Sequence, residues 1–156
     1  MIFAKTSKAL TRLNEMLRKG EIHKTYRALV EGKPKDKSAT LVDYLLSDGR
    51  INKSFLTNSS NPEAKRCELD YRVISEGDRY SLLEIDLKTG RKHQIRAQLS
   101  GMGNPIKGDL KYGARRSNKD GCISLQAARL SFIHPVSKLL LEFEAPPLPD
   151  FLKISY

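Results

Sequence analysis

The amino-acid sequence predicts an α+β protein with a mixed, mostly antiparallel sheet. Two pairs of strand-like segments, residues 64–76 with 80–88 and residues 123–133 with 139–144, are each joined by a short polar turn. That arrangement is typical of β-hairpins. A helical pattern precedes the hairpins, and no repeat or linker divides the chain. We therefore expect residues 1–156 to belong to a single domain.

The first predicted helix follows residues 1–5, a short apolar segment that is typical of the end of a strand. Thr6 or Ser7 can cap this helix at its start, and Gly20 can end it. Its apolar side chains recur at helical spacing; they are Leu10, Leu13, Met16 and Leu17.

The next segments differ in how clearly they predict a structure. Residues 23–31 are rich in strand-forming side chains and predict a strand. Residues 41–46 are apolar and fit either one helical turn or a short strand, whereas residues 47–62 are polar and predict an exposed loop. Residues 64–76 alternate apolar and charged side chains, the period of a half-buried strand.

A cationic turn follows the predicted strand at residues 80–88. A Thr89-Gly90 turn leads into a predicted helix whose first residues are Arg91, Lys92, His93 and Gln94. A helix start favours an anion, because its backbone N–H groups are unpaired and its dipole is positive there. Arg91 and Lys92 could contact phosphate, and Gln94 could orient a base. A solvated basic helix start is the alternative.

Four further residues are candidates for a site. Arg96 lies near the predicted core, where an arginine usually pairs with a carboxylate. Tyr26 fits either a core tyrosine or a platform that stacks a base. Asp109 could bond its own backbone in the loop at residues 107–113 or act as a catalytic carboxylate. Leu125 fits ordinary core packing.

The charge of the chain narrows the class of partner. Twenty-eight Lys and Arg face 18 Asp and Glu, for a net charge of +10 and a pI near 9.7. This balance indicates a polyanionic partner, either nucleic acid or an anionic membrane surface, although a merely solubilising surface would look the same. No long basic amphipathic helix with aromatic anchors is present, which disfavours the membrane surface.

Other sequence features bear on location and cofactors. No apolar stretch is long enough for a membrane span or a signal peptide. Cys67 and Cys122 are isolated, and we expect free thiols in a reducing, cytoplasmic compartment. The three histidines lie far apart without ligand spacing, so we expect no metal site.

Four blocks of sequence, taken together, resemble the RNA pseudouridine synthases that modify ribosomal and transfer RNA. They are AKTSKALTRLNEMLRKGEIHKTYRALVEGKP, TGRKHQIR, PIKGDLKYG and LQAARLSFIHP, and they cover most of the chain in order. The resemblance implies a bifurcated, mostly antiparallel sheet with flanking helices. It also implies isomerisation of a uridine in RNA, with no cofactor and no metal.

The same resemblance assigns roles to individual residues. It implies that Tyr26 stacks on the target base and serves proton removal, that Arg96 pairs with the nucleophilic Asp and keeps it ionised, and that Leu125 packs under the uracil. These roles agree with physical expectation: a buried arginine lowers the pKa of its carboxylate partner, and an aromatic face suits a flipped base. We expect RNA contacts from the basic residues around this turn and the following loop: Arg91, Lys92, His93, Lys107, Lys111, Arg115 and Arg116.

The chain also departs from the family pattern. The family's nucleophilic Asp lies in an Arg-Leu-Asp block just before the segment that corresponds to residues 3–5, and this sequence has no such block. Gln126 stands where relatives usually have His. We therefore expect a partial catalytic domain, residues 1–156, that lacks its N-terminal part and is inactive alone; the alternative is a non-catalytic RNA-binding module. Arg96 should then be exposed, bind a substitute anion, or pair with a different acid.

Overall fold

The computed structural model describes residues 2–153, which form two α-helices, seven strands and two short 3₁₀ turns. In chain order these are α1 (Ser7–Lys19), β1 (Ile22–Glu31), β2 (Ser38–Asp48), β3 (Lys53–Thr57), β4 (Lys65–Glu76), β5 (Tyr80–Leu87), α2 (Gln94–Gly101), η1 (Leu110–Tyr112), β6 (Leu125–Ile133), β7 (Leu140–Glu144) and η2 (Pro149–Lys153).

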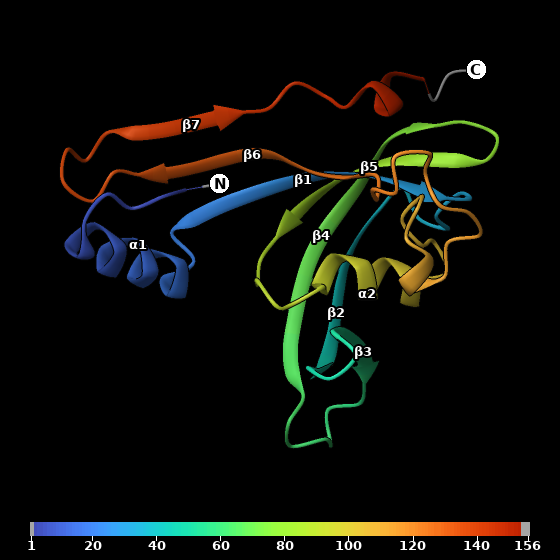
Figure 1. The fold of residues 1–156 in the computed structure, drawn as a ribbon, viewed down its shortest axis with the longest axis horizontal. Helices are drawn as coiled ribbons and strands as arrows, with labels where there is room; N and C mark the ends of the chain where they lie inside the picture. The colour runs from blue at the N-terminus through green and yellow to red at the C-terminus, as the bar shows by residue number, and fades with distance from the viewer. Residues whose placement is uncertain (1, 154–156) are drawn as a thin grey trace.

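The strands form one sheet in the order β3-β2-β4-β5-β1-β6-β7, and every pair of neighbours is antiparallel. In Figure 1, β1, β6 and β7 run together across the molecule, whereas β4, β2 and β3 descend as a separate arm. The predicted α+β fold, both predicted hairpins and the bifurcation are confirmed. The sheet is antiparallel throughout the described residues, rather than mixed.

Helix α1 has the ends that its sequence predicts. The Thr6 Oγ1 accepts a hydrogen bond from the Ala9 N–H at 3.1 Å, and Gly20 ends the helix with a left-handed φ of 73°. Met16 is the buried contact of this helix and packs with Ile22 and Phe132. Helix α1 therefore covers one end of the β1–β6 pair.

The main core lies between α2 and the centre of the sheet, where the two arms diverge (Figure 1). Ile95 and Leu99 from α2, together with Ile106 from the following loop, pack on the inward side chains of β1, β4 and β5. These sheet residues are Ala28, Val30, Leu69, Tyr71, Leu83 and Ile85. This packing fixes α2 and the loop after it, and both carry candidate site residues.

Four expectations about local structure were wrong or incomplete. Residues 2–5 form no strand, and the ambiguous residues 41–46 lie inside β2. The predicted loop at residues 47–62 contains β3, which pairs with β2 through contacts such as Leu46 with Phe55. Helix α2 begins at Gln94 rather than Arg91, because His93 has a left-handed backbone with a φ of 54° that cannot continue a helix.

Candidate functional site

The centre of the candidate site is an ion pair between Arg96 of α2 and Asp109 of the following loop. The Arg96 Nε lies 2.7 Å from Asp109 Oδ2, and Arg96 Nη2 lies 2.7 Å from Asp109 Oδ1. The Asp109 side chain is 1% exposed and that of Arg96 is 19% exposed. Both carboxylate oxygens are therefore bound in the paired geometry that a guanidinium favours. Of the three expected outcomes for Arg96, the structure shows pairing with a different acid.

The loop holds Asp109 through its backbone. The Lys107 N–H donates to the Leu29 carbonyl at 2.8 Å, and Ile106 forms a bridge with Val30, so this part of the loop is attached to β1. The Asp109 carbonyl accepts the N–H groups of Tyr112 and Ala114, each at 3.0 Å. Asp109 makes side-chain hydrogen bonds to Arg96 alone among the described residues, so it is not a turn aspartate that bonds its own backbone.

The aromatic ring of Tyr112 packs against the guanidinium of the ion pair. The Arg96 guanidinium carbon lies 4.6 Å from the centre of the Tyr112 ring, within cation–π range. The Tyr112 hydroxyl accepts the Ser54 N–H at 2.9 Å and lies 3.0 Å from the Nδ1 of His93. Hydrogen bonding to Asp109 raises the pKa of Arg96. The guanidinium is thus a permanent cation that is held from two directions.

His93 lies among other cations. Its ring packs edge-on against Tyr112, with 5.8 Å between the ring centres. Burial lowers the pKa of His93, and the positive charges of Arg96, Lys92 and Lys111 lower it further. His93 is therefore held in its neutral form at neutral pH by its surroundings.

Gln94 has a structural role instead of the base-orienting role that its position suggested. It is 2% exposed, and its Oε1 accepts the Thr89 hydroxyl at 2.8 Å and the Arg91 N–H at 3.0 Å. Its Nε2 donates to the Glu68 carbonyl and to Gln98 Oε1, each at 3.0 Å. With both ends of the amide engaged, Gln94 closes the Thr89–Gly90 turn onto β4.

Tyr26 and Leu125 lie on the neighbouring strands β1 and β6. Leu125 pairs with Ala28, and Tyr26 pairs with Ala127. Both side chains are partly buried and pack against the core cluster that contains Ile95, the residue before Arg96. Burial raises the pKa of the Tyr26 hydroxyl. Tyr26 and Leu125 therefore border the core cluster to which α2, the helix of Arg96, contributes Ile95 and Leu99.

The predicted RNA-contacting residues separate into groups. Lys92, His93 and Lys111 gather around Tyr112, while the Arg91 Nε donates to the Arg66 carbonyl at 3.3 Å. Lys107 already pairs with Asp150 at 2.7 Å.

Arg115 and Arg116 lie apart from that cluster. Together with Arg79 they line a cavity of about 720 Å³ at the end of the β1–β5 pair. The backbone N–H of Arg115 donates to Glu31 at 2.9 Å. The predicted basic residues therefore form more than one surface.

Sequence reasoning missed three residues of this site: Lys53, Ser54 and Tyr112. Lys53 and Ser54 lie on β3, in the segment that was predicted to be a loop, and reach the site only because β3 pairs with β2. The Lys53 Nζ lies 5.2 Å from the centre of the Tyr112 ring. No spacing in the sequence joins these residues to Arg96.

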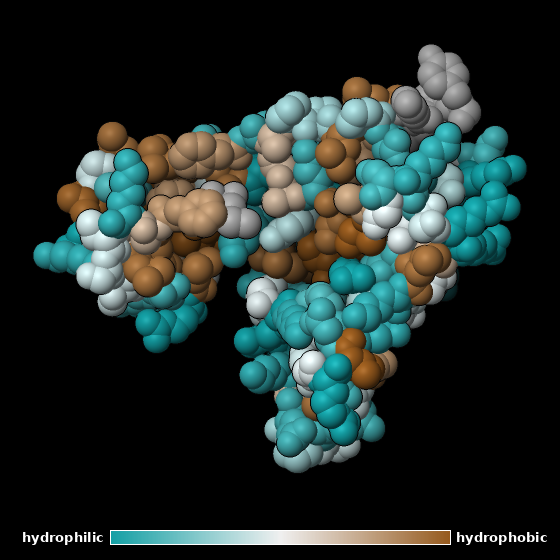
Figure 2. Space-filling model, viewed as in Figure 1, coloured by the Kyte–Doolittle hydropathy of each residue, from teal (hydrophilic) through white to brown (hydrophobic). Residues whose placement is uncertain are grey.

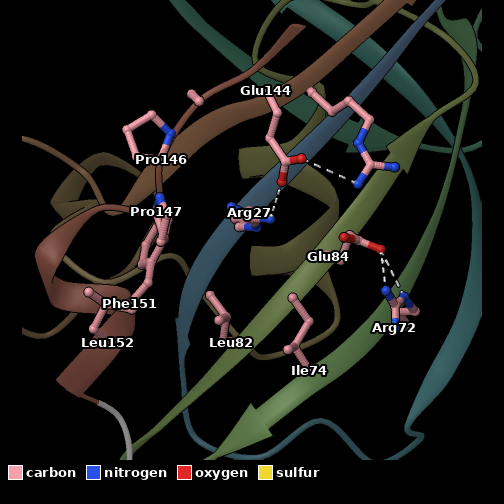
Figure 3. Close-up of a pocket in the computed structure, with 12 residues that line it drawn as sticks. Arg27, Arg72, Ile74, Leu82, Glu84, Glu144, Pro146, Pro147, Phe151 and Leu152 are labelled. Atoms are coloured by element: carbon pink, nitrogen blue, oxygen red, sulfur yellow. Dashed lines mark hydrogen bonds and ion pairs between the residues drawn. The ribbon is translucent and has the colours of Figure 1, made fainter. Parts of the chain in front are cut away.

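A second cavity, of about 800 Å³, lies elsewhere and contains none of the predicted site residues. Figure 3 shows Glu144 accepting a hydrogen bond from Arg27, and Arg72 paired with Glu84, above the apolar side chains of Leu82, Ile74 and Phe151. Its three arginines, Arg27, Arg72 and Arg129, all pair with Glu84 or Glu144, which leaves this groove only one positive charge in excess.

Three further observations concern metals, membranes and thiols. Within residues 2–153, no group of three or more His, Cys, Asp or Glu is placed to hold a metal ion. No described helix is long and apolar enough to cross a membrane. Cys67 and Cys122 are free, and burial raises the pKa of the Cys67 thiol to about 11.

The chain matches a known family along most of its first two thirds. The family profile described as RNA pseudouridylate synthase matches residues 1–101. An uncharacterized RNA pseudouridine synthase of Chloroflexus aurantiacus is 36% identical over 155 residues, which is 99% of this chain and 48% of that protein. The ribosomal large subunit pseudouridine synthase D of Zymomonas mobilis is 32% identical over 153 residues, or 93% of this chain and 48% of that protein.

Solved structures show the same fold. The human RNA pseudouridylate synthase domain containing 1 protein superposes with a TM-score of 0.77 at 24% identity, covering 94% of this chain and 64% of that one. The human RNA pseudouridylate synthase domain containing 4 protein gives a TM-score of 0.74 at 22% identity. The chain spans about half the length of the curated relatives that it matches.

Proposed function

The chain belongs to the RNA pseudouridylate synthase family, and we propose that it forms the substrate-holding part of an isomerase that converts uridine to pseudouridine in ribosomal or transfer RNA. The observation that carries the proposal is the oriented Arg96 on α2, the helix whose Ile95 and Leu99 pack in the core cluster that Tyr26 and Leu125 border. The name of the Zymomonas relative favours large-subunit ribosomal RNA. The free cysteines are consistent with a cytoplasmic setting.

In this proposal the three residues act on a uridine that is flipped out of its RNA. Tyr26 offers an aromatic face to the base and, through its hydroxyl, a proton acceptor or donor. Leu125 supports the uracil from the neighbouring strand. Arg96 supplies a fixed positive charge that keeps a nucleophilic carboxylate ionised. The resemblance to the family implies that this reaction needs no cofactor.

We propose further that the chain alone does not isomerise uridine. The sequence contains no Arg-Leu-Asp block, and the chain spans about half of its relatives. Asp109 is a poor substitute for the nucleophile, because it is 1% exposed and both of its oxygens bind Arg96. Residues 1–156 would then be part of a catalytic domain that lacks its N-terminal part.

A non-catalytic RNA-binding module is the second candidate function. The satisfied Arg96–Asp109 pair favours it, since the charge that would hold a nucleophile is already neutralised within the chain. The net charge of +10 supports RNA binding in both candidates. The two differ only in whether a longer form of the protein carries the nucleophile.

Pseudouridine mapping tests the proposal. The chain is incubated with total RNA, and new pseudouridines are mapped; we expect RNA binding without new pseudouridines. The genomic sequence upstream of Met1 is then read in frame. If it encodes an Arg-Leu-Asp block, a protein extended by those codons should be active, and its Arg96→Met variant should not be. Robust turnover by the 156-residue chain would show that one of its own aspartates suffices and would overturn the proposed inactivity.

A further inference from the structure

A cluster of positive charge lies where β3, the start of α2 and η1 meet. The Lys53 Nζ lies 5.2 Å from the ring centre of Tyr112 and 5.3 Å from that of Phe55. The Lys111 Nζ donates to the carbonyls of Ile51 and Asn52, each at 3.0 Å. Three segments that are far apart in the sequence thus bring their cations to one place.

No acid of the described residues forms an ion pair with the lysines of this cluster. Among the ion pairs of residues 2–153, none involves Lys53, Lys92 or Lys111. The neighbouring acids are engaged elsewhere: Asp48, opposite Lys53 across the β2–β3 pair, binds Arg50. Asp109 is bound to Arg96 through both oxygens. An excess of cations held together in this way is stabilised by an external anion.

The hydrogen-bond network also favours a donor at Nε2 of His93. The Tyr112 hydroxyl accepts the Ser54 N–H at 2.9 Å, so its own proton is free to donate to His93 Nδ1 at 3.0 Å. No other acceptor for that proton occurs among the described hydrogen bonds. A neutral imidazole that accepts at Nδ1 carries its proton on Nε2. In this tautomer the Nε2–H of His93 is left as a donor.

Ser54 holds the segment around His93, whose backbone is strained. His93 has a φ of 54°, which is uncommon for a residue other than glycine. The buried Ser54 hydroxyl donates to the Lys92 carbonyl at 2.8 Å, and its N–H holds Tyr112. A strained residue persists when its surroundings determine it and is common at ligand sites. The strain here presents the ring of His93 toward the cationic cluster.

We propose that Lys53, Lys92 and the Nε2–H of His93 bind one backbone phosphate of the RNA, with Lys111 adding positive charge beside them. This phosphate subsite rests on the proposed function, since it takes RNA as the ligand, and it adds Lys53 to the RNA-contacting residues. The ring of Tyr112 contacts both Lys53 and Arg96. The phosphate would therefore lie next to the Arg96–Asp109 pair, where it can fix the position of the target nucleotide.

The main test is the salt dependence of RNA binding. Fluorescence anisotropy with a labelled RNA hairpin measures affinity between about 50 and 200 mM salt. We expect Lys53→Gln to weaken binding several-fold and to reduce the slope of log affinity against log salt by about 1. The matched control is Lys8→Gln, which removes an exposed lysine from α1 at the other end of the molecule and should leave both values unchanged.

A second measurement addresses His93 directly. The groups that act on it are Tyr112, Lys92, Arg96, Lys111 and Asp109, and Lys53 lies over the ring of Tyr112. A bound phosphate favours the protonated ring, so we expect the wild-type affinity to rise as the pH falls from about 7.5 to 5.5. His93→Asn should remove most of this rise, because Asn tolerates the left-handed backbone but does not titrate. An equal rise in the variant would exclude His93 from the subsite.

The outcomes separate the subsite from the function. If the wild-type chain binds the hairpin and Lys53→Gln binds it with the same affinity and slope, the subsite is wrong while the proposed RNA function stands. If the wild-type chain fails to bind any RNA at low salt, the proposed function itself fails. If inorganic phosphate shifts the His93 ring signals in NMR spectra and the hairpin does not, the site takes free phosphate, and its assignment to RNA is overturned.

Discussion

At the level of single residues, the pairing of Arg96 with Asp109 fixes the geometry of the candidate site. Buried ion pairs add little net stability, because desolvation of the two charges offsets their attraction. Their clearer effect is on geometry: Asp109 holds one edge of the guanidinium, and Tyr112 holds its face. An arginine fixed in this way presents its remaining N–H groups in one orientation, as a catalytic or binding arginine requires.

Removal of the Asp109 charge is expected to destabilise the fold. The Asp109→Asn variant leaves the Arg96 guanidinium largely buried without its counter-charge, and we expect a loss of about 2–4 kcal/mol in the free energy of unfolding. Urea denaturation followed by circular dichroism measures this change. The Asp109→Leu and Arg96→Met double variant should recover most of the loss, because it removes both charges.

An exposed ion pair provides the control for this prediction. Asp86 pairs with Lys88 at the surface, and Asp86→Asn should change the free energy of unfolding by less than about 1 kcal/mol. Equal losses in Asp86→Asn and Asp109→Asn would contradict the assignment of Arg96–Asp109 as the buried pair of the site.

The lowered pKa of His93 predicts how stability varies with pH. The unfolded chain binds a proton at His93 with a pKa near the ordinary value of about 6.5, whereas the folded chain binds it only at lower pH. The unfolded state therefore holds more protons as the pH falls through this range, and the contribution of neutral His93 to stability is lost. We expect the free energy of unfolding to fall between about pH 7 and pH 5, and His93→Asn to reduce that fall.

At the scale of the elements, the loop at residues 107–113 depends on one glycine. Gly108 has a φ of +86°, and a Cβ there would lie 2.7 Å from the Cys122 carbonyl oxygen and 2.6 Å from the Asn118 amide nitrogen. The backbone on both sides of Gly108 is held, by β1 on one side and by η1 on the other. Asp109 follows directly, so any shift at Gly108 moves the ion pair.

The Gly108→Ala variant is therefore expected to lose about 2 kcal/mol or more, from backbone strain and from the contact with Cys122. Urea unfolding measures the loss, and RNA affinity should fall with it because Lys111 and Tyr112 follow in the same loop. Gly49→Ala is the matched control, since a Cβ at Gly49 meets nothing within 4 Å. A neutral Gly108→Ala would mean that the loop can relax without cost.

The elements that were predicted well are those whose side chains show a clear period. The alternation along β4 placed Cys67, Leu69 and Tyr71 inside, and the structure buries all three. The start of α1 at Thr6 and its end at Gly20 were also predicted, because helix caps depend on the chemistry of a few neighbouring residues. Strand β3 was missed because it is five residues long and stable only through pairing with β2.

The site was less predictable than the fold. The need of Arg96 for a carboxylate could be inferred from its place near the core, and the resemblance gave the same pairing in the family. The identity of that carboxylate could not be inferred, because Asp109 is brought to Arg96 by a loop that is attached to β1. Lys53 and Ser54 join the site through the register of β3 on β2. Such contacts between distant segments have no local sequence signal.

The whole molecule is polarised between a hydrophilic arm and an apolar end. Figure 2 shows hydrophilic side chains over the arm formed by β2, β3 and β4, and hydrophobic ones over α1 and β7. The exposed apolar residues at this end include Phe3, Leu10, Leu17, Leu139, Leu140 and Phe143. The proposed phosphate subsite lies on the arm, and the apolar end is available for contacts of another kind.

The apolar end coincides with an open edge of the sheet, which predicts self-association. Among residues 2–153, β7 pairs with β6 alone, so its outer edge has no strand partner there, and Leu140 is 63% exposed. Unpaired edges with apolar side chains associate with other chains, whereas a lysine on an edge opposes this. We expect Leu140→Lys to weaken self-association by about tenfold, or roughly 1.4 kcal/mol, as measured by sedimentation equilibrium. Val42→Lys changes an exposed apolar residue on the interior strand β2 and should have little effect; equal effects would indicate that general hydrophobicity, and not the edge, drives association.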